Sequence, residues 1–483
     1  MSDIKKISLK PAKCAVDLGD GSERGFYVNQ DYILRKLLRP HRAINIMYCY
    51  YPLDETWPKR AQDAFADKEV GFAWDYPYDN YFPYLGGLNG KTDGEPFTCM
   101  QDIRKHGQDV ILTMTVDPHI SDEHIKAIAK DLRPYGRLML RLNHEATGDW
   151  FSFTKRASYK EIADFFLHFR DIFAVEAPNV KLILCAGAIE NSGSGKLEKE
   201  EDFLEAYKNT DIWSIDDYIA LNWGWPYEVA EKDNNSHKLT DPKVIYKKAK
   251  DSFNRLMELS GGVKRPFVMS ELNVDGDVTG QELQAKIFND FIEEVKKDGE
   301  GWFSGFTMYQ FRDDGRLGLE QTDFNNKNEG IEQPLLKTYK NIIHDDFFKP
   351  QIKDEGSATL PVTLRWGGSE DADGFGMELS FEGQPVFAEV NFEGSLKDAN
   401  LMMEINGSWI YKAPGATFAD LMPAFYNKPL TGPCKLSLNF FAPPADGKNA
   451  ETSKKDWDVN YYTSLTELPK VRLRFEPVMK LDK

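Results

Sequence analysis

The sequence of 483 residues lacks the features that mark several large classes of protein. No apolar run approaches the roughly 18 residues that a membrane-spanning helix needs, so we expect no membrane span. Basic residues are scarcer than acidic ones, 60 Lys and Arg against 77 Asp and Glu. The resulting net charge of −17 disfavours a nucleic acid or an anionic membrane surface as a partner.

Cysteines are few and form no CxxC pair. The five are widely spaced and indicate neither a disulfide framework nor a zinc site: Cys14, Cys49, Cys99, Cys185 and Cys434. The opening stretch "MSDIKKISLK" lacks the apolar segment of about 7 to 15 residues that a signal peptide contains. We expect a secreted, periplasmic or cell-surface protein if a signal peptide has been removed, and a cytoplasmic protein otherwise. The oligomeric state stays open.

Several cofactor and catalytic motifs are also missing. No GxGxxG follows the first apolar run, and no GxSxG indicates a serine hydrolase. "HEATG" lacks the second histidine of the zinc-protease motif, and "NSGSGKLE" lacks the leading glycine of a phosphate-binding loop. We therefore expect a protein that works without a cofactor or a metal.

Short apolar runs do recur, and they alternate with amphipathic segments through about the first 345 residues. This alternation predicts an α/β fold with a parallel sheet, and the eight runs favour a (β/α)8 TIM barrel over an open doubly wound sheet. The predicted strands are 43–51, 69–76, 108–117, 136–143, 180–188, 217–225, 265–273 and 305–311. The clearest predicted helices are 121–132, 158–176, 241–259 and 280–299.

The pattern changes near residues 345–361, where short alternating runs and Gly or Pro turns replace helical periodicity. This spacing predicts a C-terminal antiparallel β-sandwich. We expect residues 1–348 to form the barrel and residues 349–483 the accessory sandwich. The sandwich is expected either to bind carbohydrate, through Trp409, Tyr411 or Trp457, or to stabilise the barrel without a ligand of its own.

Reactive residues of such a barrel lie at the C-terminal ends of its strands. A glutamate closes the predicted strand at only two such ends: Glu145 ends the fourth run and Glu271 the seventh. Strands four and seven face each other across the barrel mouth, and glycosidic-bond hydrolysis requires such a carboxylate pair. A separation of about 5 to 5.5 Å would give a retaining reaction through a covalent intermediate. Alternatively, each glutamate caps a helix or pairs with an arginine.

The segment around the first glutamate, "RLNHEATGDWF", resembles the acid/base segment of glycoside hydrolase family 26, which includes the β-mannanases, or of a closely related retaining (β/α)8 family. The shared residues are Arg141, His144, Gly148, Asp149, Trp150 and Phe151. The resemblance implies that Glu145 is the general acid/base and Glu271 the nucleophile. It is specific around 141–151 and looser at 267–273. Ala146, Thr147, Phe153 and the Glu-Leu-Asn of the seventh run depart from the family pattern, which leaves the substrate open.

Other residues near the strand ends are candidates for substrate binding. Period-2 alternation would place Arg141, Asn143 and Glu145 on one face of the fourth strand, with His144 beside the acid. Tryptophan rings can stack on pyranose faces. The remaining candidates are Trp150, Asn222, Trp223, Trp225 and Tyr309. Tyr218 begins the sixth predicted run and is therefore expected at the far end of the barrel, in a structural role.

These observations favour a retaining endo-β-glycanase of mannanase-like type, acting on a polysaccharide or oligosaccharide. β-1,3-Xylan, mixed-linkage glucan and sulfated algal galactan remain alternative substrates. A non-catalytic carbohydrate-binding protein on a degenerate hydrolase barrel is a further alternative. A metal-dependent hydrolase or an aldolase would show clustered His and Asp, or a lysine, at strand ends, and neither pattern stands out.

Overall fold

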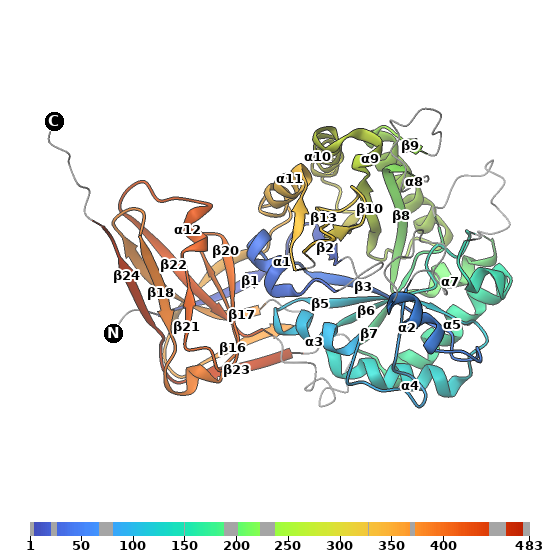
Figure 1. The fold of residues 1–483 in the computed structure, drawn as a ribbon, viewed down its shortest axis with the longest axis horizontal. Coiled ribbons are helices and arrows are strands. Elements are labelled where there is room, and N and C mark those ends of the chain that lie inside the picture. The colour runs from blue at the N-terminus through green and yellow to red at the C-terminus, as the bar shows by residue number, and fades with distance from the viewer. Residues whose placement is uncertain are drawn as a thin grey trace.

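The computed structural model describes residues 4–20, 27–66, 81–148, 150–187, 201–222, 237–326, 328–367, 372–443 and 460–476. Figure 1 shows a closed barrel wrapped by helices, with an antiparallel β-sandwich beside it. The predicted fold class is confirmed. Within the described residues, no helix is both long and apolar enough to cross a membrane.

Eight parallel strands form the barrel wall. In pairing order they are β2 (Ala15–Gly19), β3 (Ala43–Tyr50), β5 (Asp109–Val116), β6 (Leu138–Leu142), β7 (Val180–Leu184), β8 (Ile212–Asn222), β10 (Phe267–Val274) and β11 (Phe303–Met308). The ring closes because β11 pairs with β2 and β10 pairs with β8. Two short strands pair with barrel strands: β4 (Phe82–Pro83) lies parallel to β3, and β9 (His237–Leu239) lies antiparallel to β8. After β11 comes a small sheet of β12 (Arg312–Asp313), β13 (Glu320–Thr322) and β14 (Gly330–Glu332).

Amphipathic helices cover the outside of the barrel (Figure 1). They are α1 (Gln30–Leu37), α2 (Lys59–Ala66), α3 (Phe97–Lys105), α4 (Asp122–Leu132), α5 (Tyr159–Glu176), α7 (Leu204–Asn209), α8 (Pro242–Leu259), α9 (Gly276–Thr279), α10 (Gln281–Asp298) and α11 (Pro334–Ile343). Local sequence explains their starts. Ser158 and Glu161 form a capping box on α5, and Asp241 caps α8 ahead of a proline.

The first barrel strand, β2, was not predicted. Its five residues, "AVDLG", contain a buried aspartate and two small residues, so they do not look like an apolar run. The predicted strand 69–76 lies outside the described residues, and the barrel is complete with the eight strands named above. The sixth strand begins at Ile212, five residues before its predicted start. β6 and β10 are nevertheless the fourth and seventh barrel strands, as predicted.

Two antiparallel sheets form the sandwich. The larger contains β1 (Ile4–Lys10), β15 (Gln351–Ala358), β16 (Val362–Gly367), β17 (Ala372–Phe381), β19 (Leu401–Ile405), β20 (Ser408–Lys412), β22 (Cys434–Phe441) and β23 (Asn460–Leu465). The smaller contains β18 (Phe387–Asn391), β21 (Phe418–Asp420) and β24 (Lys470–Arg474), and a short helix, α12 (Pro423–Tyr426), precedes β22. Because β1 pairs with β15 and β17, the chain begins in the sandwich, and the barrel begins at β2.

The larger sheet is apolar on both faces. One face packs on the smaller sheet in a core that includes Phe375, Leu438 and Val390. The other face forms a separate cluster, with Trp366 and Trp409 against Leu34 of helix α1. This two-sided packing fastens the sandwich to the barrel.

Trp409 and Tyr411, two expected sugar contacts, lie at this interface. Trp409 is 7% exposed, and its backbone N–H donates to the Leu38 carbonyl at 2.8 Å. The Tyr411 ring lies 4.3 Å from the His106 ring of the barrel. These contacts leave neither side chain a free sugar platform, and Trp457 lies outside the described residues.

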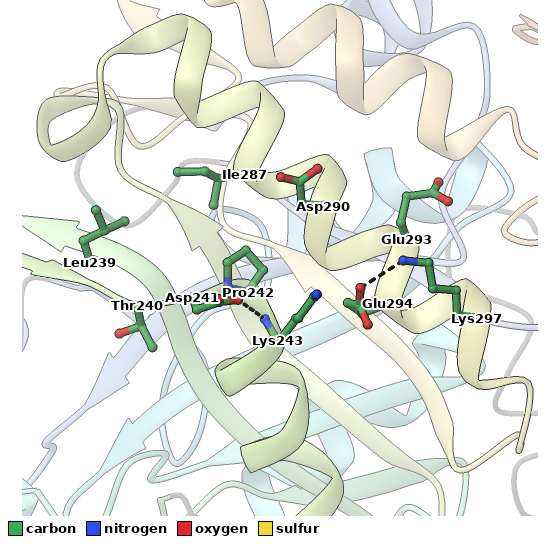
Figure 2. Close-up of a pocket in the computed structure, with 10 residues that line it drawn as sticks. All are labelled: Leu239, Thr240, Asp241, Pro242, Lys243, Ile287, Asp290, Glu293, Glu294 and Lys297. Atoms are coloured by element: carbon green, nitrogen blue, oxygen red, sulfur yellow. Dashed lines mark hydrogen bonds and ion pairs between the residues drawn. The ribbon is translucent and has the colours of Figure 1, made fainter.

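The outer helical layer contains a cavity of about 670 Å³ between the start of α8 and one side of α10. Figure 2 shows its lining, which is Leu239, Thr240, Asp241, Pro242, Lys243, Ile287, Asp290, Glu293, Glu294 and Lys297. None of these residues belongs to the strand-end pair predicted for catalysis. The cavity lies outside the barrel wall and is separate from the site described next.

Candidate active site

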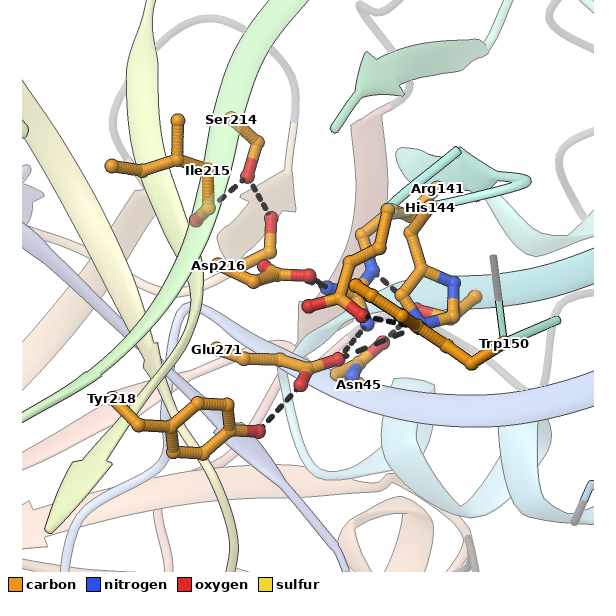
Figure 3. A network of polar contacts seen from close by, with 12 residues as sticks. Asn45, Arg141, His144, Trp150, Ser214, Ile215, Asp216, Tyr218 and Glu271 are labelled. Carbon is orange, nitrogen blue, oxygen red and sulfur yellow. Dashed lines mark hydrogen bonds and ion pairs between the residues drawn. The ribbon is translucent and has the colours of Figure 1, made fainter. Parts of the chain in front are cut away.

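A buried arginine organises the centre of the barrel. Arg141 on β6 is fully buried, and its Nη2 donates to Glu271 Oε1 at 2.5 Å. Nη1 lies 3.0 Å from each carboxylate oxygen of Asp216, and Nε donates to Thr113 Oγ1 at 2.9 Å. Burying a charge is costly unless it is paired and hydrogen-bonded, and here two carboxylates pair with the guanidinium (Figure 3).

Glu271 on β10 is held at both of its carboxylate oxygens. Oε1 accepts from Arg141, and Oε2 accepts from the Tyr218 hydroxyl at 2.5 Å. The residue is 7% exposed. These two donors fix the orientation of the carboxylate and stabilise its negative charge, as an attacking nucleophile requires.

Asp216 and Tyr218 both project from β8. They are two residues apart and therefore point to the same side of the strand, and Asp216 is the register partner of Glu271. The expectation that Tyr218 lies at the far end of the barrel is wrong, because β8 begins at Ile212 rather than at Asp217. Sequence reasoning also missed Asp216. The two aspartates inside the apolar run "IWSIDDYIALN" were the signal in the sequence that could have identified it.

Glu145 follows β6 in a tight turn with φ of 52°. Its backbone N–H donates to the Cys185 carbonyl at 2.5 Å, and its Oε2 accepts from Trp150 Nε1 at 3.1 Å. Burial raises the pKa of Glu145 well above its usual range, and the negative charges of Asp216 and Glu271 raise it further. A carboxyl group that keeps its proton near neutral pH suits a general acid.

The centre holds more negative than positive groups. Burial and the nearby Glu271 raise the pKa of Asp216 to about 7, against the opposing charge of Arg141. Three carboxyl groups therefore share one guanidinium. Like charges in a water-poor site cannot all ionise easily, so protons are retained there, which is the condition that acid catalysis needs.

His144 lies next to the two glutamates. Its Nε2 is 3.2 Å from the Tyr81 hydroxyl and 3.8 Å from Glu271 Oε1, and its ring lies 4.6 Å from that of Phe151. Burial and the positive charge of Arg141 lower the pKa of His144 well below its usual range. The imidazole is therefore neutral and acts in the site as a hydrogen-bonding group rather than as a cation.

Asn143 is directed to the neighbouring strand. Its side chain accepts from the Val116 N–H at 2.6 Å and donates to the Val116 carbonyl at 3.1 Å. Strand β6 ends at Leu142, and Asn143 has φ of 47°, so the period-2 alternation expected through Glu145 stops there. Asn143 thus supports the turn that carries Glu145.

The remaining predicted residues differ in accessibility. Trp150 is 46% exposed, whereas Tyr309 is buried and packs edge-on against Tyr218 with ring centres 5.7 Å apart. Asn222 is buried at the end of β8, and its backbone N–H donates to Asp275. Trp223 and Trp225 lie outside the described residues.

A group of possible metal ligands lies in the same place. Ligand atoms of His144, Asp216 and Glu271 are within 4.8 Å of one another. Arg141, however, already pairs with both carboxylates, so a divalent cation would have to displace a buried guanidinium and would be repelled by it. This donor set does not fit a metal ion.

Comparisons with known proteins give a likeness of architecture. No family model and no curated protein matches the chain. The catalytic domain of a family 26 endo-β-1,4-mannanase from Bacillus sp. JAMB-750 is 12% identical, with 70% of this chain and 87% of that chain covered and a TM-score of 0.42. A family 26 β-mannanase from Bacteroides ovatus is 11% identical, covering 70% and 90%, with a TM-score of 0.41. A family 51 α-L-arabinofuranosidase from Bifidobacterium longum is 12% identical, covering 89% and 96%, with a TM-score of 0.42. These glycoside hydrolases assign no role to any residue of this chain.

Proposed function

We propose that the protein is a retaining glycoside hydrolase that cleaves β-linked polysaccharide, with Glu145 as general acid/base and Glu271 as nucleophile. One observation carries the proposal. The carboxylate of Glu271 is held by Arg141 and Tyr218, and it lies in the same charge cluster as Glu145. Burial and the neighbouring acids raise the pKa of Glu145. A charged nucleophile beside a protonated acid is the arrangement that the first step of such hydrolysis needs.

In the first step, Glu145 gives its proton to the glycosidic oxygen while a Glu271 oxygen attacks the anomeric carbon. The bond between that carbon and the glycosidic oxygen breaks, and the leaving sugar departs as an alcohol. The product on the protein is a glycosyl ester of Glu271. Arg141 and Tyr218 hold the attacking carboxylate in place, so little reorganisation accompanies the attack.

In the second step, water attacks the anomeric carbon, and Glu145, now a carboxylate, takes its proton. The bond from the anomeric carbon to Glu271 breaks and restores the carboxylate. Two inversions at one carbon leave the product with the configuration of the substrate.

A neutral β-linked glycan is the best-supported substrate class. The cation at the centre, Arg141, is already paired with Asp216 and Glu271, so it is not available to bind a sulfate or carboxylate group of a substrate. Among neutral glycans, mannan is the leading candidate because residues 141–151 resemble the acid/base segment of family 26; β-1,3-xylan and mixed-linkage glucan are the alternatives, and sulfated galactan is disfavoured. The alternative of a non-catalytic binding protein gains no support, because the carboxyl groups share one buried cluster.

The test begins with Glu271→Ala, which should abolish turnover while circular dichroism and the melting temperature stay close to those of the parent. Products from a panel of β-linked polysaccharides will identify the sugar, and NMR of the first product formed should show retained configuration. A deoxyfluoro glycoside should label Glu271, as peptide mass spectrometry would detect. Full turnover by the variant, or an inverted product, would contradict the assignment.

A further inference from the structure

We propose that Trp150 is a positioning residue for Glu145. Its indole N–H holds Glu145 in the carboxylate form that the second step of hydrolysis needs. This inference rests on the proposed function. It differs from the stacking role expected of an exposed tryptophan, because it uses the edge of the ring that carries the N–H and not its face.

The contact is direct and local. Trp150 Nε1 lies 3.1 Å from Glu145 Oε2, and the two residues are five positions apart in the chain. An indole nitrogen can only donate a hydrogen bond, so it favours an acceptor that is fully charged. The side chain is 46% exposed, so one part of the ring reaches the acid while another remains open to a substrate.

A glycine in the same turn makes room for this contact. A Cβ atom added at Gly148 would lie within 3.0 Å of three ring atoms of Trp150, closer than side chains pack. The Gly148 N–H also donates to the Glu145 carbonyl at 2.9 Å and closes the turn. The indole ring therefore packs directly against the backbone of Gly148, and this packing directs its N–H towards Glu145.

The charged groups around Glu145 explain why the second step needs such a donor. Asp216 and Glu271 disfavour its carboxylate form, and so does burial, whereas Arg141 and Trp150 favour it. In the first step the acid must be protonated, and in the second it must be ionised. Once Glu271 has become an ester, its negative charge is gone. The indole N–H then stabilises the ionised Glu145 and orients the oxygen that receives the proton of water.

Trp150→Phe is the sharpest test, because it keeps an aromatic ring and removes the N–H. A dinitrophenyl β-glycoside of the identified sugar needs no protonation of its leaving group, so its first step stays fast. We expect the burst of dinitrophenol to persist while steady-state kcat falls about 10-fold, in line with the loss of one hydrogen bond to a charged group.

The pH profile provides a second readout. With a poorly activated substrate, the alkaline limb of kcat/KM reports the free acid, and losing the indole donor should move that limb about 0.5 to 1 unit higher. The acid limb of kcat for the dinitrophenyl glycoside should also move to higher pH. Gly148→Ala should cause the same shifts by displacing the ring. Gly94→Ala is the control, because an added Cβ there meets nothing within 4 Å.

The outcomes separate this inference from the proposed function. A raised KM for Trp150→Phe with an unchanged kcat and unchanged pH limbs would reduce Trp150 to a stacking platform and overturn the inference. Turnover that survives in Glu271→Ala would overturn the proposed function instead. Shifted limbs in both Trp150→Phe and Gly148→Ala, with Gly94→Ala unchanged, would support the inference.

Discussion

Two buried charge clusters lie in the same barrel and differ in their balance. At the N-terminal end of β5, Asp109 is paired with two arginines, Arg104 Nη1 at 2.5 Å and Arg137 Nη2 at 2.7 Å. At the centre of the site, Arg141 is paired with two carboxylates, and a third carboxyl group lies nearby.

The two clusters differ in whether each charge has its own partner. At Asp109 each carboxylate oxygen has its own cation, so the charge is compensated. At Arg141 the carboxyl groups outnumber the cation, and burial together with the neighbouring carboxylates raises the pKa values of Glu145 and Asp216. Uncompensated acids that retain protons can do acid catalysis, whereas compensated ones only hold strands together. The stabilising cluster lies at the end of the barrel where stability residues are expected.

The largest effect should come from removing the central cation. Arg141→Met leaves buried carboxyl groups without compensation, so turnover should fall on the order of 10³-fold. The free energy of unfolding should fall by about 3 to 5 kcal/mol at neutral pH and recover towards acid pH, as the carboxyl groups take up protons. Urea unfolding at two pH values measures the free energy of unfolding, and steady-state kinetics measure kcat. A variant that retained its activity would contradict the difference drawn between the two clusters.

The second cluster should respond differently. Asp109→Asn removes the carboxylate that compensates the fully buried Arg104, and we expect a loss of about 3 to 5 kcal/mol in the free energy of unfolding. Turnover per folded molecule should stay within about 2-fold of the parent, because Thr113 and Val116 of β5 still contact Arg141 and Asn143 in the candidate site. Active-site titration with a deoxyfluoro glycoside normalises the rate. A large drop in normalised kcat would show that the clusters are not independent.

The smallest effect concerns the pH dependence of stability. The pKa of Asp216 is raised in the folded protein to about 7, so the folded state binds its proton more tightly than the unfolded state does. Stability from this group is therefore greatest at low pH and falls as pH rises from about 4 towards 7. Asp216→Asn should remove that decline, by the order of 1 kcal/mol or more. Chemical unfolding across this window measures the slope; an unchanged slope would contradict the prediction.

Much of the architecture could be predicted from periodicity. Strands β3, β5, β6, β7, β10 and β11 coincide with predicted runs, and the strand ends that carry Glu145 and Glu271 are the fourth and seventh. The first strand could not be found, because buried Asp17 and the glycine at its end disguise it. The predicted strand 69–76 lies outside the described residues, and β2 is the first strand of the barrel, so β6 and β10 are still the fourth and seventh strands.

The site was predicted less completely than the fold. Tyr218 was placed at the wrong end because β8 begins earlier than its apolar pattern indicates, and Asp216 was overlooked for the same reason. Trp409 was one of three candidates for sugar binding by the sandwich, the alternative being a stabilising domain without a ligand. Packing between the sandwich and helix α1 buries it. An aromatic residue in a sequence carries no information about which surface will cover it.

The sequence by itself determined which strand ends carry a glutamate, where helices α4, α5, α8 and α10 begin, and that the chain is acidic, because these depend on local pattern and composition. Only the tertiary structure decided that Arg141 pairs with Glu271 and Asp216, that Tyr218 reaches Glu271, and that Trp150 donates to Glu145. The physical reason is that burial and charge act through space between residues far apart in the chain. They exist only once the barrel has closed.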